Sequence, residues 1–167
     1  MAAQDPQSRR WSLTINHPKD CGLDHDTIIE RLHLFHPRYF CLADEIGESG
    51  TYHTHIYLFS HSPIRFSTIK NRFPPAHIEK SMKGSVANRD YITKSGKWAD
   101  TKKAETSVEG TFLEFGDIPT EAEEDSPSMY ALMGCVEQGM TNAEIIRQKP
   151  SYAFRLKGID EMRDTLQ

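Results

Sequence analysis

Two histidines are the residues of this chain whose type and spacing most directly suggest chemistry. His53 and His55 flank Thr54 in residues 51–59, which alternate with period two and are rich in aromatic and β-branched residues. Such a stretch predicts a β-strand, in which side chains two apart leave the same face about 6.5–7 Å apart. That spacing suits one shared divalent ion, with bonds to nitrogen of about 2.0–2.2 Å. Taken alone, the pair is better explained as two histidines on a half-solvated strand.

A carboxylate is predicted beside the two histidines. Residues 39–45 alternate in the same way, and residues 47–50 supply a turn, so the two stretches are expected to pair as a hairpin. Glu45 then shares the face of the histidines, while Asp44 points to the opposite face and Glu48 falls in the turn. One carboxylate and two imidazoles with open positions suit Mg²⁺ or Mn²⁺ holding a phosphate oxygen.

A tyrosine and a lysine share a predicted helix. Residues 85–94 read as helical, with Ser85 as the N-cap and Gly96 beyond the C-terminus. Tyr91 and Lys94 fall on one stripe of this helix. By themselves, they are better explained as a core aromatic residue and a solvated charge.

The remaining patterns complete an α+β chain. Asp24 or Asp26 can cap a helix that ends before Pro37. The order β-α-β-β-α-β-α predicts a ferredoxin-like, split β-α-β antiparallel sheet with helices. A further strand is expected near residues 97–98 or 111–115. The other predicted strands are residues 9–16 and 76–82, and the other predicted helix is residues 63–73.

Composition limits the classes of protein. At 167 residues the chain can bury one sizeable core with a small helical appendage. No apolar run approaches the ~18 residues that span a membrane, and no signal peptide is evident, so an intracellular protein without membrane contact is expected. Three separated cysteines without a C-x-x-C motif indicate neither a disulfide framework nor a zinc finger.

Charge divides the chain near residue 104. Residues 1–103 carry a formal charge of +4 and residues 104–167 carry −8, and within the first part residues 61–103 carry +7. Such a basic segment can neutralise phosphates. The alternative is an ordinary surface decorated with lysine and arginine.

Three motifs together resemble the nuclease domain of the replication-initiator (Rep) proteins of the HUH endonuclease superfamily, found in circular single-stranded DNA viruses and related plasmids. These are residues 11–18 (WSLTINHP), 53–55 (HTH) and 91–94 (YITK), in the order and spacing of the family. Residues 76–80 are also similar to the strand that precedes the family's tyrosine helix. The resemblance covers residues 9–100.

The resemblance implies a metal-dependent, site-specific endonuclease and ligase for single-stranded DNA that starts rolling-circle replication. It implies that Glu45, His53 and His55 hold Mn²⁺ or Mg²⁺, that Tyr91 is the nucleophile, and that Lys94 helps to place the metal or phosphate. A tyrosine hydroxyl, with an ordinary pKa of about 10, attacks poorly at neutral pH unless its target is activated. Exchange of one phosphoester for another is reversible, so the same site can rejoin strands.

The expected partner is single-stranded origin DNA with a stem-loop. The middle residue of the histidine motif is usually apolar in the family, whereas Thr54 is polar, which favours the plasmid-type branch and the bacterial cytoplasm. A virus of eukaryotes would place the protein in the host nucleus. The residues expected to contact DNA are Arg10, Asn16, Lys80, Lys83, Arg89 and Lys97.

The chain after the nuclease domain carries no chemistry of its own. We expect a disordered tail over residues 1–8, the nuclease domain over 9–116, an acidic linker over 117–127 and a helical oligomerisation segment over 128–167. The apolar faces of these last helices are expected to lack a core and to favour homo-oligomers. No Walker-type loop is present, so a helicase domain is expected to be missing from this chain.

Two other classes share some of these features. RNA-recognition modules have a similar order of elements and stack bases on sheet aromatics without catalysis. A non-catalytic metal-binding or partner-docking domain, using the acidic half, is the other. The RNA-recognition alternative leaves Glu45, His53, His55 and Tyr91 without a joint role.

Overall fold

A five-stranded antiparallel sheet, in the order β4-β1-β3-β2-β5, organises the first 115 residues. The computed structural model describes residues 4–101, 106–125, 129–148 and 150–166. The sheet confirms the predicted α+β, ferredoxin-like arrangement, and the fifth strand lies at the second of its two expected positions. The strands are β1 Gln7–Asn16, β2 Pro37–Ile46, β3 Tyr52–Arg65, β4 His77–Lys80 and β5 Leu113–Phe115.

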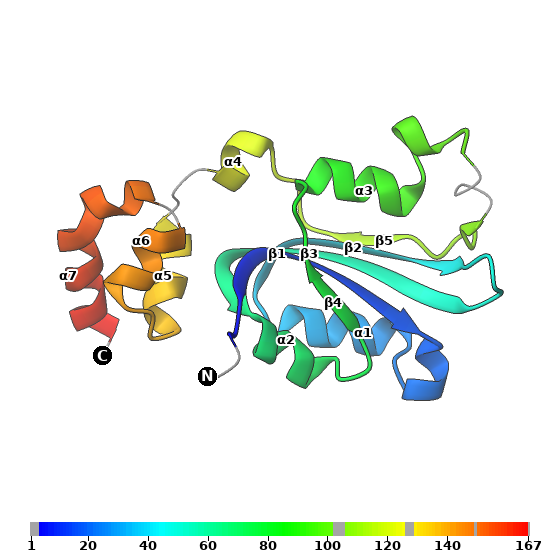
Figure 1. Cartoon of the computed structure of the whole chain (residues 1–167), viewed down its shortest axis with the longest axis horizontal. Helices are drawn as coiled ribbons and strands as arrows, with labels where there is room; N and C mark the ends of the chain where they lie inside the picture. The colour runs from blue at the N-terminus through cyan, green and yellow to red at the C-terminus, as the bar shows by residue number, and fades with distance from the viewer. Residues whose placement is uncertain (1–3, 102–105, 126–128, 149, 167) are drawn as a thin grey trace.

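Helices cover both faces of the sheet. Figure 1 shows α1 (His25–His33) and α2 (Phe66–Arg72) on one face and α3 (Ser85–Thr93) on the other. Two 3-10 turns, η1 (Pro18–Cys21) and η2 (Gly96–Trp98), follow β1 and α3. Strands that lie between two layers of helices need apolar residues on both of their faces, and successive residues supply the two faces in turn.

Alternation along the strands supplies these two layers. Large apolar side chains of β1, β2 and β3 form the main core with α1 and α2, and the intervening residues of β2 and β3 form a smaller core under α3. The main core includes Trp11, Leu13, Ile15, Phe40, Leu42 and Leu58, and the smaller one Tyr39, Cys41, Tyr57, Phe59 and Ile92.

Asp44 faces the side of the sheet opposite to Glu45, as predicted. Its carboxylate accepts hydrogen bonds from Thr54 Oγ1 (2.6 Å) and the Tyr52 hydroxyl, and it pairs with His25 Nε2 at 2.9 Å. The buried hydroxyl of Thr54 thereby has a hydrogen-bond partner on the face that α1 and α2 cover. This polar cluster fixes β2 against β3 directly behind the predicted metal ligands.

The helix ends differ in part from the prediction. Asp24 is the N-cap of α1 and accepts a hydrogen bond from Thr27 N at 2.8 Å, so the first of its two proposed caps is confirmed. The prediction that Ser85 caps α3 is wrong. Gly84 is the N-cap, and Ser85 is the first helical residue. Lys94 is the C-cap in the left-handed conformation, and Gly96 begins η2.

The N-terminal residues are more structured than a free tail. β1 begins at Gln7, inside the stretch 1–8 that was expected to be disordered. Asp5 accepts hydrogen bonds from the backbone and side chain of Ser67 in the first turn of α2, at 2.9 and 2.6 Å. Residues 1–3 lie outside the described residues.

The C-terminal helices form a core of their own, which corrects the expectation that their apolar faces lack one. Figure 1 shows them as a bundle at one end of the sheet, reached through a short helix, α4. Their buried residues include Leu132, Cys135, Met140, Ile145 and Ile159. Self-association through this segment stays a prediction. The helices are α4 Glu121–Asp125, α5 Met129–Glu137, α6 Asn142–Gln148 and α7 Leu156–Leu166, with the 3-10 turn η4 Pro150–Arg155 before α7.

The bundle rests on the sheet through α5 and β3. A Cβ atom at Gly134 of α5 would overlap the Cβ of Ser62 on β3, so glycine permits this close approach. Within the described ranges, every helix is too short or too polar to cross a bilayer.

Candidate metal centre and tyrosine site

Glu45, His53 and His55 converge on one face of the sheet. β2 and β3 pair with Glu45 directly opposite His53, and His55 follows two residues along β3. The two Nε2 atoms are 3.1 Å apart, and Glu45 Oε2 lies 3.0 Å from His55 Nε2 and 3.8 Å from His53 Nε2. Ligands bound at about 2.1 Å with angles near 90–109° are separated by about 3.0–3.4 Å, which matches two of these distances, and the third corresponds to a wider angle of about 130°. The three atoms are therefore close enough to share a single divalent ion.

Hydrogen bonds orient the two histidine rings for metal binding. His55 Nδ1 contacts Thr14 Oγ1 at 3.2 Å, and His53 Nδ1 lies 3.1 Å from the carbonyl oxygen of Thr51. These contacts leave both Nε2 atoms directed at Glu45. Outer contacts of this kind fix the ring tautomer and orientation of metal-binding histidines.

The charges of the cluster suit a divalent cation. Burial of Glu45 disfavours its ionised form, but hydrogen bonds from His55 and Thr106 and the charge of Lys94 outweigh this and lower its pKa to about 2. Burial, together with nearby His55, lowers the pKa of His53 below its usual value. At neutral pH Glu45 is therefore a carboxylate and His53 a neutral imidazole, the forms that bind metal.

We expect the metal-free protein to lose stability in acid through Glu45. Because the pKa of Glu45 is lowered in the folded state, its contribution is complete above about pH 4.5 and is lost as the pH falls towards 2. Thermal melts with a chelator should show this loss, up to about 3 kcal/mol. Glu45→Gln should flatten the profile between these pH values, and an unchanged profile would contradict the assignment.

Tyr91 and Lys94 reach the same cluster from α3. The Tyr91 ring lies 5.9 Å from the His55 ring and 5.1 Å from the Trp98 ring, between centroids. The Lys94 Nζ atom lies 3.7 Å from the Tyr91 ring centroid and 3.2 Å from Glu45 Oε2, and its side chain is 3% exposed. The backbone of Lys94 is left-handed, a conformation that favours glycine, and the lysine side chain is buried beside Glu45.

Sequence patterns did not identify two supporting residues. Thr14 lies in the predicted strand over residues 9–16, but it was given no role at the site. Thr106 donates to Glu45 Oε1 at 2.6 Å from the segment before β5. With Lys94 on Oε2 and Thr106 on Oε1, both carboxylate oxygens of Glu45 are oriented. Thr106 lies 61 residues from Glu45, and no local pattern could have identified it.

The residues expected to contact DNA are spread over the surface. Asn16, opposite His53 in the register, is exposed on the face of the metal cluster. Lys83 and Lys97 are also exposed, and Lys97 lies over the Trp98 ring. Lys80 pairs with Trp11 in the register and therefore points to the opposite face.

Both arginines that were expected to contact DNA are already paired within the protein. Arg10 contacts Glu124 at 3.4 Å, and Arg89 donates to Glu114 at 2.9 and 3.3 Å. A phosphate would have to compete with these carboxylates. The structure therefore brings the tyrosine and metal residues together, but it does not gather the six basic and polar residues into one patch.

An antiparallel sheet that carries two histidines and a glutamate, beneath a helix that brings a tyrosine and a lysine to them, is consistent with the class of Rep-type replication initiators. The family model described as "Putative viral replication protein" matches residues 8–95. The chain belongs to this family, and its role therefore lies in replication. A search of curated proteins found no match. The family is described as viral, which gives no support to the preference for a plasmid source.

Proposed function

We propose that this protein nicks and rejoins single-stranded DNA at a replication origin through Tyr91, with a divalent ion held by Glu45, His53 and His55. The observation that carries the proposal is the convergence of the three ligands within 4.8 Å of one another, beside a tyrosine ring 5.9 Å from His55. A structural metal site would not require a tyrosine and a buried lysine at its rim.

The reaction is a phosphoester exchange. The Tyr91 hydroxyl attacks the phosphorus atom, the bond from phosphorus to the 3′ oxygen breaks, and the phenol proton passes to solvent while the leaving oxygen takes one up. The products are a 5′-phosphotyrosine and a free 3′-hydroxyl. Since one phosphoester replaces another, attack by a 3′-hydroxyl reverses the step and joins strands without a nucleotide cofactor.

The side chains around Tyr91 have distinct tasks. The bound ion would act as a Lewis acid on a non-bridging phosphate oxygen, a contribution of several kcal/mol. The ammonium group of Lys94, buried against the phenol ring, stabilises the negative charge that develops on the attacking oxygen and on the phosphate. The same group orients Glu45.

The DNA strand is proposed to cross the open half of the site face. α3 packs against β2 and β3, whereas the β1 and β4 side of this face carries polar residues. Ser12, Thr14 and Asn16 lie there in a row. An RNA-recognition module would need exposed aromatic residues on the face that binds the nucleic acid, but the aromatic residues that β2 and β3 bury under α3 (Tyr39, Tyr57 and Phe59) are at most 2% exposed.

A labelled pool of randomised single-stranded oligonucleotides tests the proposal. Incubation with the full chain and Mn²⁺ should give a product that migrates slowly on a denaturing gel, and peptide mass spectrometry should place the nucleotide on Tyr91. Absence of this adduct, or its attachment to another residue, would refute the proposal. The recovered sequences would define the nicking site and show whether a stem-loop is required.

A further inference from the structure

Glu124 of α4 is a buried carboxylate that connects the linker to the tyrosine helix. Its side chain is 1% exposed, although the neighbouring acidic residues Asp117, Glu121 and Glu123 are exposed. Oε1 accepts hydrogen bonds from the backbone N–H of Ser85 (2.9 Å) and from its hydroxyl, and it lies 3.5 Å from the Tyr57 hydroxyl. An acidic side chain is rarely buried so completely unless it is fully partnered.

The carboxylate occupies the place of a missing N-cap. Gly84, the N-cap of α3, has no side chain to bond the free N–H groups of the first turn. A Cβ atom at Gly84 would lie 2.8 Å from Glu124 Oε2, so glycine leaves the space that this carboxylate fills. The negative charge also lies at the positive end of the helix dipole.

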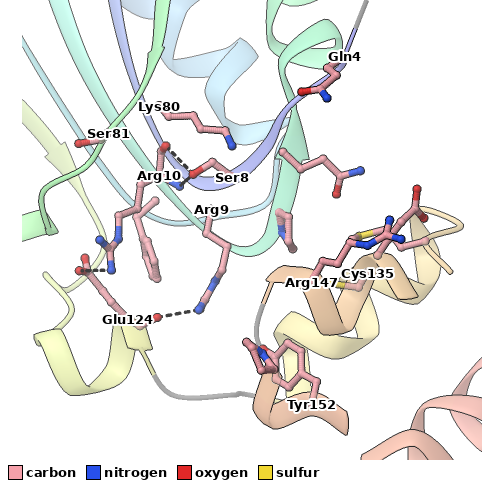
Figure 2. Close-up of a pocket in the computed structure, with 16 residues that line it drawn as sticks. Gln4, Ser8, Arg9, Arg10, Lys80, Ser81, Glu124, Cys135, Arg147 and Tyr152 are labelled. Atoms are coloured by element: carbon pink, nitrogen blue, oxygen red, sulfur yellow. Dashed lines mark hydrogen bonds and ion pairs between the residues drawn. The ribbon is translucent and has the colours of Figure 1, made fainter. Parts of the chain in front are cut away.

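The first strand holds Glu124 from the other side. Figure 2 shows Arg10 directed at the carboxylate and Arg9 directed at the backbone of Glu124. Arg10 Nη2 lies 3.4 Å from Oε2, and Arg9 Nη1 donates to the Glu124 carbonyl oxygen at 2.7 Å. Residue 124 thus joins β1, α3 and α4 at one point.

The start of α4, the linker helix that carries Glu124, is stabilised by its own side chains. Thr120 and Glu123 form a capping box at its start: Thr120 N donates to Glu123 Oε2 at 2.9 Å, and Glu123 N donates to Thr120 Oγ1 at 3.2 Å. Five helical residues would be marginal alone. Docking of Glu124 supplies the tertiary contact that keeps α4 in place.

We propose that Glu124 is a positioning residue for Tyr91, and that it makes nicking depend on the docking of the linker helix. This inference rests on the proposed function, in which Tyr91 is the nucleophile. Tyr91 lies on α3, six residues after Ser85. The orientation of α3 determines where the phenol lies relative to His55, and Glu124 fixes one end of that helix. Movement of α4 therefore shifts the nucleophile without any change in the metal ligands.

The test compares full-length variants in single-turnover nicking of an oligonucleotide that forms the adduct with the wild type. Glu124→Ala should slow adduct formation about tenfold, because loss of an N-cap contact lowers the population of the ordered start of the helix by about that factor, while DNA affinity changes less than about twofold. Glu124→Gln should be intermediate, because its amide oxygen still accepts from Ser85. Glu121→Gln, which removes the same charge from an exposed position on α4, is the matched control and should behave as wild type.

Gly84→Ala tests the same contact with Glu124 left intact. The added methyl group must displace the carboxylate, so this variant should also slow nicking. In the Glu124→Ala background the methyl group meets no carboxylate, and Gly84→Ala should cost little further. Additive effects of the two changes would contradict a shared mechanism.

Hydrogen exchange separates failure of this inference from failure of the proposed function. Amides at the start of α3 should exchange about tenfold faster in Glu124→Ala and Gly84→Ala than in Glu121→Gln, whether or not any DNA is cut. If the wild type forms no adduct but this pattern appears, the nuclease assignment fails and the cap remains. If Glu124→Ala matches Glu121→Gln in both exchange and nicking, or nicks faster and binds DNA more tightly, the positioning role is refuted.

Discussion

Tyr91→Phe is expected to abolish the covalent protein–DNA product and to lower nicking by at least about 10³-fold. The variant keeps the ring that packs against His55 and Trp98 and loses the one oxygen proposed to attack phosphorus. Metal binding and folding should therefore be unchanged, since no ligand is altered. The measurement is adduct yield on a denaturing gel over time, with Mn²⁺ in excess.

Tyr152→Phe provides the matched control for this change. Tyr152 is buried in the core of the C-terminal helices, away from the metal cluster, and loses the same hydroxyl group. It should form adduct at the wild-type rate. Equal adduct from Tyr91→Phe and the wild type would mean that another residue attacks, and the proposed mechanism would be wrong.

Removal of the metal ion, or of one ligand, is expected to have the second large effect. A chelator should stop nicking, and added Mn²⁺ or Mg²⁺ should restore it. His55→Ala should weaken Mn²⁺ binding by at least about 100-fold, because His55 Nε2 contacts both other ligands of the cluster. Loss of the free Mn²⁺ signal in electron paramagnetic resonance reports this binding directly and needs no DNA.

His61→Gln is the control for the metal experiment. His61 lies on the same strand as His55 but outside the cluster, so it should bind Mn²⁺ as the wild type does. A wild-type protein that nicks equally well in the presence and absence of chelator would contradict the metal assignment. Tight Mn²⁺ binding by His55→Ala would contradict the ligand set.

The core of the C-terminal bundle removes the reason for which self-association of the chain was expected. Self-association was expected because the apolar helix faces were thought to have no core, whereas Leu132, Cys135 and Ile159 are buried against one another. Phe154 remains 94% exposed on this segment. Any contact between copies through this segment would therefore use residues such as Phe154 on the outside of a formed bundle.

Much of the candidate site could be predicted because it depends on local periodicity. Period-two alternation puts His53 and His55 on one face, and a short hairpin turn sets Glu45 opposite His53. The two metal-binding strands are joined by a turn, so their register follows from few residues. The helix that carries Tyr91 was also evident from its spacing, although its N-cap was assigned one residue too late.

The remaining features were decided by tertiary structure. The contacts of Glu45 with Thr106 and of Glu124 with Ser85 join residues 61 and 39 apart, and Arg9 reaches Glu124 across 115. Local pattern carries no information about which distant carboxylate will meet an arginine, so the pairing of Arg10 with Glu124 of the linker was not predicted. By itself the sequence determined the faces on which the reactive side chains lie. Only the packed structure decided which buried charges neutralise one another, because a buried charge must find its partner wherever the fold brings one close.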